Sequence, residues 1–152
     1  MLVAVAAVAG GVSLAMLPHR SPVPAAPAET LSAQPAQVAV VDGGTLRLGD
    51  RVVRLLGVEP LARGTSCADQ DCGVASTNAL AVMVREAPVV CRITGMDSTG
   101  RPYGICRAGG TELNRSVILA GWARADTTEP KLQRAEQAAR SERRGIWAPS
   151  RE

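Results

Sequence analysis

Residues 41–60 read VDGGTLRLGDRVVRLLGVEP. Apolar positions alternate in two runs of this segment, and turn-forming pairs stand at Gly43-Gly44 and at Gly49-Asp50. The pattern predicts a short β-meander with one buried face. Three ionisable residues fall near the predicted strand ends, where a rigid sheet can present them together: Asp42, Arg54 and Glu59.

The same segment carries a family resemblance. Residues 42–45 (DGGT) and 54–59 (RLLGVE) resemble the Asp-Gly-Asp-Thr and Arg-Leu-Leu-Gly-Val-Asp motifs of the staphylococcal-nuclease-like (thermonuclease) family. Residues 97–101 (DSTGR) are similar to that family's Asp-x-Tyr-Gly-Arg, and residues 114–123 and 136–147 are similar to its last two motifs. Motifs in the family's order, covering roughly residues 38 to 147, are far more specific than one short pattern.

This resemblance implies an α+β fold, namely a small five-stranded β-barrel of the oligonucleotide/oligosaccharide-binding (OB) type flanked by three helices. Periodicity alone reaches only a single α+β domain. The apolar periodicity and the glycine and proline positions predict three helices. The first follows Gly73 and has an apolar stripe through Leu80 and Val84. The second covers residues 112–120 and is ended by Gly121, and the third starts at Pro130.

The N-terminal region has a different composition. Residues 2–18 carry no charge, and residues 21–35 are rich in proline and alanine. We expect residues 1–18 to be a signal peptide or membrane anchor, residues 19–37 a linker, and residues 38–149 the staphylococcal-nuclease-like domain. A protein so built is exported and stands in the periplasm or is tethered at the cell envelope, with the N-terminal segment as its contact to the membrane.

The four cysteines all lie in the predicted domain, at positions 67, 72, 91 and 106. Cys91 and Cys106 are equidistant from the turn predicted at residues 97–100, so a symmetric hairpin opposes them directly, within reach of a disulfide. Cys67 and Cys72 would then close a short loop. The alternative is a four-cysteine zinc site, although the close Cys-x-x-Cys pairs typical of such sites are absent.

The family resemblance also implies chemistry. Its members hydrolyse phosphodiesters of DNA and RNA with a calcium ion held by carboxylates, a glutamate as the general base, and two arginines that stabilise charge on the phosphate. Carried over by position, Arg54 and Arg101 match the two arginines. Glu59 matches one calcium ligand and is a candidate catalytic residue as well. Asp42 is retained from the first motif and is the other candidate metal ligand.

Two positions of the family's machinery are changed. Gly44 replaces a calcium carboxylate, and Ala62 stands where the general base is expected. We therefore expect calcium to bind weakly and hydrolysis to be weak or absent. The retained residues also have structural interpretations, because Asp42 could cap its turn, Arg54 could pair with Glu59, and Arg101 could pair with Asp97.

Two functional classes remain open from the sequence. One is an exported nuclease-like enzyme with impaired catalysis, whose substrates would be nucleic acids bound on the barrel face. The other is a non-catalytic OB-type binding or scaffold module with an unidentified protein partner. The net charge of +3 permits contact with phosphates without requiring it. The sole histidine, His19, precedes the domain, so imidazole catalysis within the domain is excluded.

Overall fold

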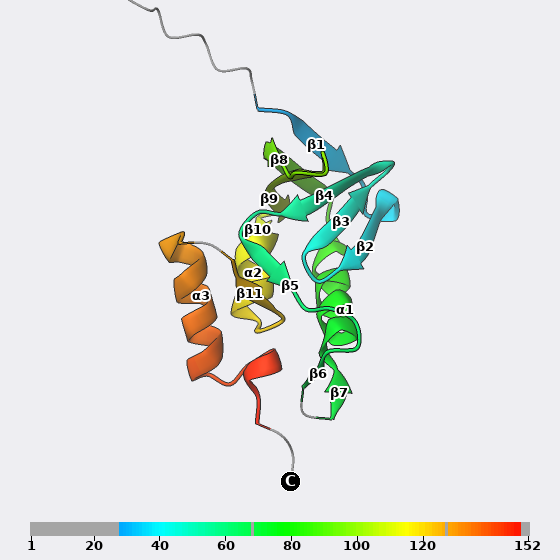
Figure 1. Ribbon diagram of the computed structural model, residues 1–152. Coiled ribbons are helices and arrows are strands. Elements are labelled where there is room, and N and C mark those ends of the chain that lie inside the picture. The colour runs from blue at the N-terminus through cyan, green and yellow to red at the C-terminus, as the bar shows by residue number, and fades with distance from the viewer. Residues whose placement is uncertain (1–27, 68, 127, 150–152) are drawn as a thin grey trace, which may run out of the picture.

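The computed structural model describes residues 28–67, 69–126 and 128–149. These residues form an α+β domain in which the long strands make a mixed sheet and three α-helices gather at one end of it (Figure 1). The arrangement is that of an OB-type barrel with three helices, as predicted. The predicted signal peptide or anchor, residues 1–18, lies outside the described residues.

The predicted meander is confirmed. It consists of β2 (Val38–Asp42), β3 (Thr45–Leu48) and β4 (Arg51–Leu55), while β5 (Val58–Pro60) follows them in the chain and lies outside their sheet. Alternation along β4 buries Val53 and Leu55 and leaves Arg54 on the outer face. The turn at Gly49 has a positive φ of 61°, which glycine adopts without steric cost.

The second half of the barrel is a hairpin of β8 (Val89–Met96) and β9 (Pro102–Ala108). β9 also runs parallel to β4, with Arg54 in register with Tyr103, and this pair joins hairpin and meander into one sheet. The sheet order is β1-β8-β9-β4-β3-β2, and the short β10 (Thr111–Glu112) pairs with β9.

The strands at the two ends of this order are neighbours in the chain. β1 (Thr30–Ala33) pairs antiparallel with β8, and only one 3-10 turn, η1 (Pro35–Gln37), separates β1 from β2. The sheet therefore curls round, and β1 and β2 together act as the first of five barrel strands. The prediction that residues 19–37 are a linker is wrong for this part, because residues 30–33 form a strand and the folded domain extends N-terminal of residue 38.

The helices follow the predicted signals closely. They are α1 (Cys72–Val84), α2 (Leu113–Leu119) and α3 (Pro130–Ser141), followed by the 3-10 turn η2 (Gly145–Trp147). Gly121 follows α2 with a φ of 79°, and Pro130 is the first residue of α3. The short strand β11 (Ala123–Ala125) lies between α2 and α3 and pairs with β5.

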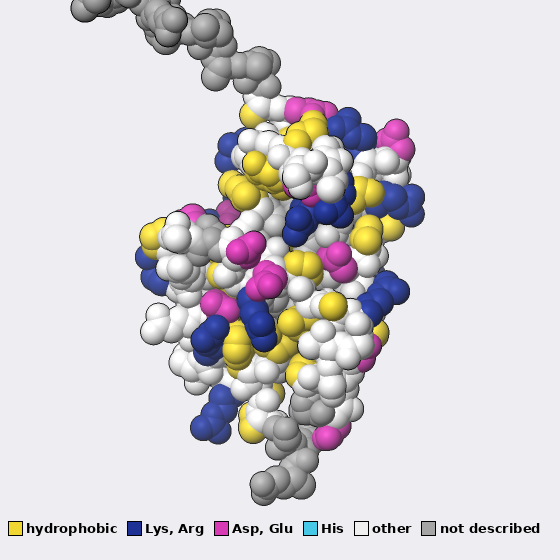
Figure 2. All heavy atoms as spheres, viewed as in Figure 1, with side chains coloured by type: hydrophobic (Ala, Val, Ile, Leu, Met, Phe, Trp, Pro, Cys, Tyr) yellow, Lys and Arg dark blue, Asp and Glu magenta, His cyan; other side chains and the backbone are white. Residues whose placement is uncertain are grey.

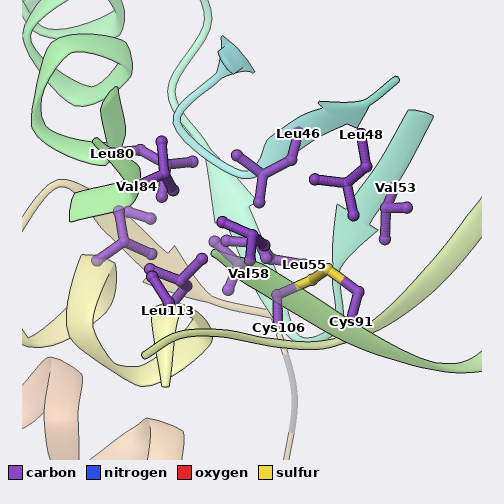
Figure 3. Close-up of a cluster of buried hydrophobic side chains, with 14 of the residues drawn as sticks. Leu46, Leu48, Val53, Leu55, Val58, Leu80, Val84, Cys91, Cys106 and Leu113 are labelled. Carbon is purple, nitrogen blue, oxygen red and sulfur yellow. A yellow bond between two sulfur atoms is a disulfide. The ribbon is translucent and has the colours of Figure 1, made fainter. Parts of the chain in front are cut away.

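The core lies between the barrel and the helices. Leu46, Val53 and Leu55 from the meander meet Leu80 of α1 and Leu113 of α2, and the Cys91–Cys106 disulfide lies among them (Figure 3). Cys91 and Cys106 are direct partners in the β8–β9 register, with 4.0 Å between their Cα atoms. The second disulfide, Cys67–Cys72, connects the end of β6 (Ser66–Cys67) to the start of α1, with β7 (Gln70–Asp71) between them. Both predicted disulfides are thus present, and no described cysteine is free.

A buried amide joins the barrel to the helices. The Asn114 side chain accepts from the backbone N–H of Cys106 (2.9 Å) and donates to the carbonyls of Leu56 (2.9 Å) and Gly104 (3.0 Å). Strand β4 pairs with β9 only as far as Gly104, and β10 pairs with the same side of β9 from Arg107 onward. Asn114 fills the gap between these two strands by bonding the backbone groups of Gly104 and Cys106.

In the part of the chain that the structure describes, no helix has the length and apolar character needed to cross a membrane.

The hairpin disulfide gives a stability prediction. Replacing Cys91 and Cys106 together by alanine should lower the free energy of unfolding by about 2–4 kcal/mol, because the bridge closes a loop of 15 residues in the unfolded chain. Urea denaturation monitored by tryptophan fluorescence measures the change. The paired Cys67→Ala/Cys72→Ala variant, whose loop spans 5 residues, should lose less. An equal or larger loss in that second variant would contradict the loop-entropy explanation.

Candidate active site

The β8–β9 turn is built on the carboxylate of Asp97. Its Oδ1 accepts from the backbone N–H of Thr99 (2.9 Å), from the Thr99 hydroxyl (2.6 Å) and from the backbone N–H of Arg101 (3.0 Å). Aspartate at the first position of a turn commonly accepts such bonds. The carboxylate is therefore held in one orientation, with its second oxygen turned toward the barrel.

That second oxygen brings together the two arginines that the sequence singled out. Arg101 Nε donates to Asp97 Oδ2 at 3.0 Å, and Arg54 Nη1 lies 3.7 Å from the same atom. Arg54 reaches the turn because β4 runs beside β9. The prediction that Arg101 pairs with Asp97 is correct, whereas Arg54 pairs with Asp97 instead of Glu59.

These contacts make Asp97 a strongly stabilised anion. The Thr99 hydroxyl, followed by the backbone N–H of Arg101, holds the pKa of Asp97 well below its usual range, and the Arg101 guanidinium adds to the effect. Both arginines share one carboxylate, so the cluster as a whole keeps one excess positive charge.

Beside this cluster the surface is hollowed. A depression of about 220 Å³, which we call the Arg54 depression, is lined by Arg54, Leu56, Asp97, Tyr103 and Asp126 among others. Tyr103 lies across β8, where a Cβ added to Gly95 would stand only 2.4 Å from its hydroxyl oxygen. The sequence offered one signal for Tyr103, namely its place two residues after Arg101 in a predicted strand, where alternate residues face the same side. The position of Asp126 had no local signal, because the pairing of β11 with β5 brings it there.

The first family motif has lost a carboxylate, and a side chain at position 44 would be crowded. A Cβ built on Gly44 would lie 3.2 Å from Pro60 Cδ, 3.3 Å from Pro60 Cβ and 3.3 Å from Val58 Cγ1. Asp42 caps this turn, since its Oδ1 accepts from the backbone N–H of Gly44 at 2.8 Å. Asp42 therefore caps its turn, as the structural interpretation of this residue predicted. Its role as a metal ligand stays a prediction.

Glu59 lies on the outer face of β5, and its cross-strand partner is Arg124 of β11. Opposed residues in an antiparallel pair have Cβ atoms about 4.5–5.5 Å apart, so the residue directly across from Glu59 is an arginine and not a second carboxylate. The Arg124 guanidinium itself lies 5.9 Å from the centre of the Trp147 ring. Within the described ranges, no group of three or more His, Cys, Asp or Glu side chains could hold a metal ion. This donor set does not fit a calcium ion.

A further carboxylate, that of Glu112, takes part in ion pairs away from Glu59. Glu112 of β10 binds Lys131 (2.7 Å) and lies 3.7 Å from Arg107, and the rest of this face mixes both signs of charge. Figure 2 shows acidic side chains gathered over the region of β5 and β11, with basic side chains on either side. Ala62, at the general-base position, is exposed and begins the loop that leads to Cys67.

The Asp97 cluster predicts a pH dependence. Because the pKa of Asp97 is lower in the folded state than in the unfolded chain, the unfolded state takes up the proton first as the pH falls. The stabilising contribution of the ionised Asp97 carboxylate is therefore complete above the pKa of about 4 that aspartate has in the unfolded chain, and it is lost at lower pH. Asp97→Asn should be less stable than the wild type at pH 7, and urea denaturation should show this difference shrinking below pH 4.

Asp50→Asn, in the exposed β3–β4 turn, is the matched control for the loss of one negative charge. A difference between wild type and Asp97→Asn that stays constant from pH 7 to pH 2.5 would contradict the assigned role of the Asp97 carboxylate.

Comparison with known proteins bears on this geometry. Residues 52–149 match the family described as staphylococcal nuclease homologue. The matched span contains Arg54, Glu59 and Arg101 but not the first motif at residues 42–45. A search of curated proteins found no match. Since the matched span is more than half of the chain, this protein belongs to the staphylococcal nuclease homologue family.

Proposed function

We propose that this protein is an exported member of the staphylococcal nuclease family that has lost calcium-dependent phosphodiester hydrolysis. The observation that carries the proposal is the packing of Gly44 against Pro60. Glycine supplies no metal-binding carboxylate, and a side chain at this position would require Pro60 or Val58 to shift by a few tenths of an ångström. Affinity for calcium depends strongly on the number of charged oxygen ligands, so the remaining Glu59 alone is a poor site.

Three further features support the loss of hydrolysis. Ala62 supplies no general base, and a positioned base typically contributes 10²–10⁴-fold in rate. The residue directly across from Glu59 on β11 is Arg124, so that strand offers no second carboxylate ligand there. Asp97 already binds both arginines, which reduces the charge they can offer to a phosphate in a transition state.

A second function is favoured by the Arg54 depression. It persists on the outer face of the barrel, although it is no longer beside a plausible metal site. Arg54, Tyr103 and Asp126 can give a bound molecule a cation, an aromatic face and an anion. An OB-type binding module that uses this surface is our second candidate, since a fold alone does not specify its chemistry.

Export is supported by the chemistry of the cysteines. Two disulfides in a domain of this size are typical of oxidising compartments outside the cytoplasm. The uncharged residues 2–18 have the composition of an export segment or anchor.

The proposed loss of hydrolysis predicts that the wild type shows little calcium-stimulated cleavage of single-stranded DNA. The backbone of Gly44 is not in the left-handed region, so crowding by Pro60 is the main obstacle to an aspartate. Gly44→Asp/Pro60→Thr/Ala62→Glu should therefore gain more calcium-dependent stabilisation than Gly44→Asp/Ala62→Glu. A ligand at 100 times its dissociation constant stabilises the folded state by about 2.7 kcal/mol, which thermal denaturation with and without calcium detects.

Glu59→Gln in the triple variant is the matched control and should abolish the gain. A fluorogenic oligonucleotide assay follows hydrolysis in the same samples. Robust calcium-dependent cleavage by the wild type would overturn the proposal. If that cleavage also survived both Glu59→Gln and Arg54→Ala, the active site would lie elsewhere.

The proposed export is tested separately. Residues 1–29, which end before β1, should direct a reporter that is active only outside the cytoplasm, and deletion of residues 2–18 from the fusion should silence it. Reporter activity in whole cells is the measurement. Equal activity with and without residues 2–18, or a reporter that is present but inactive in both fusions, would contradict export by this segment.

A further inference from the structure

Helix α1 has an exposed face without charge. No Asp, Glu, Lys or Arg occurs between Cys72 and Val84, although one side of this helix is exposed. A helix at the surface of a domain normally carries charged and polar residues on its outer face. Here the outer face carries Val74 and Val82, which are 44% and 57% exposed. Exposed apolar surface of this kind is typical of a site where a partner binds.

The exposed face is a consequence of where α1 lies. The helix packs against β2 and α2, and α3 stands on the other side of α2 (Figure 1). Its buried side includes Ser76, Leu80 and Val84. A hollow of about 370 Å³ runs beside the exposed face, lined by Ala81 and Arg85 of α1 and by apolar residues of η1 and β2. The apolar surface therefore continues from the helix onto the barrel.

The exposed positions of α1 are arranged symmetrically along the helix. The two that flank the helix and three within it are Asp71, Val74, Asn78, Val82 and Arg85, all of them exposed. They are spaced by three, four, four and three residues, which at 3.6 residues per turn places them on one face. The two valines are equidistant from Asn78, and so are Asp71 and Arg85. The face thus presents the same order of apolar and polar groups from either end, with opposite charges at its two ends.

Such a face is complementary to a second copy of itself. In an antiparallel pair of helices with a two-fold axis at Asn78, Val74 of each copy meets Val82 of the other. Asp71 of each copy then meets Arg85 of the other. The two Asn78 amides face each other on the axis, and an amide both donates and accepts hydrogen bonds. A two-fold interface needs this kind of self-complementarity.

The side chains beside the stripe leave room for the second helix. Packed helices lie about 8–10 Å apart, the smaller distances requiring small side chains at the contact. Ala75 and Ala81 flank Asn78 at equal distances in the sequence, and both carry only a methyl group. In the same antiparallel pair Ala75 of one copy lies beside Ala81 of the other.

The charges at the ends of α1 favour an antiparallel pair over a parallel one. Asp69 and Asp71 stand at the N-terminal end with Arg63, and Arg85 stands at the C-terminal end, 3.1 Å from Glu86. The Arg85 and Glu86 side chains are 67% and 82% exposed, so their pairing contributes little and leaves Arg85 able to bind a second carboxylate. The helix dipole adds to this preference, since the antiparallel pair places opposite dipole ends side by side.

We propose that this protein self-associates through α1, as a two-fold symmetric antiparallel dimer with Asn78 on the axis. Association buries the exposed valines and extends over the hollow beside Ala81. One helix face is smaller than a standard interface of about 1,600 Å², so the dimer is a weak one. The proposal goes beyond the loss of hydrolysis and holds whether or not any hydrolysis remains.

The test is sedimentation velocity of the full chain, with both disulfides formed, over protein concentrations from micromolar to millimolar. The wild type should shift from monomer to dimer in this range. Val74→Glu and Val82→Lys each place one charge in the apolar contact and should weaken association at least about tenfold. Each introduced charge suits the helix dipole at its own end of α1, so both variants should fold.

A charge pair across the axis then tests the register. An equimolar mixture of Val74→Glu and Val82→Lys should regain association, and so should the double variant Val74→Glu/Val82→Lys. In both cases the introduced carboxylate of one copy faces the introduced ammonium of the other. A parallel pair would oppose like charges in the double variant and would not regain association.

Val90→Glu and Val90→Lys are the matched controls. Val90 lies on β8 and is 43% exposed, so these variants make the same chemical changes elsewhere and should associate as the wild type does. Residues 1–27 are present in every variant, so association through that segment would be equal in all of them.

Several outcomes would overturn the proposal. One is a wild type that stays monomeric over the whole range, and another is equal association in Val82→Lys, with the variant folded by circular dichroism. Association that the double variant does not regain would contradict the antiparallel register. Binding to neutral phospholipid vesicles that Val82→Lys removes, in a wild type that does not self-associate, would assign this face to a membrane surface instead.

Discussion

The domain depends on the satisfaction of backbone groups where strand β4 ends. Between the part of β9 that pairs with β4 and the part that pairs with β10, β9 has no strand partner on one side. An unpaired buried peptide group costs about as much as a lost hydrogen bond. The single side chain of Asn114 meets the need by binding Cys106, Gly104 and Leu56. In doing so it fixes α2 against the barrel, and it sets the position of the Leu56–Gly57 turn from which β5 departs.

The site residues show how a fold can persist while its chemistry changes. Arg54 and Arg101 keep their places because β4, β8 and β9 are held by the core and by the hairpin disulfide. Packing reinforces the change at position 44, because Pro60 Cδ lies 3.2 Å from where a Cβ on Gly44 would stand. Sequence reasoning identified the change at Gly44 but could not predict its contact with Pro60, which depends on how β5 folds back over the β2–β3 turn. It also could not predict that Arg124 faces Glu59, because that register is set by tertiary packing.

The fold was predictable wherever the signals were local. Turn glycines, the helix start at Pro130 and the opposed cysteines each depend on a few neighbouring residues. The hairpin is not fully symmetric, because a register shift between Ile93 and Gly95 moves the tip by one residue, but the cysteines lie on the far side of that shift from the tip. Strand β1 escaped prediction since its proline- and alanine-rich surroundings resemble a linker and its partner, β8, is remote in the chain.

The pairing of β1 with β8 also constrains the order in which the protein can assemble. Synthesis proceeds from the N-terminus, so β1 is made long before Val89–Met96, its only neighbour in the sheet order. Until then the meander can form locally, but the barrel stays open and the edge of β4 that pairs with β9 has no cover. Closure pairs Thr30 with Arg92 and so brings together segments separated by about half of the domain, which is the slow kind of step in folding. A nascent chain of this protein therefore carries an open sheet until β8 and β9 have been made, and β8 then covers the first strand.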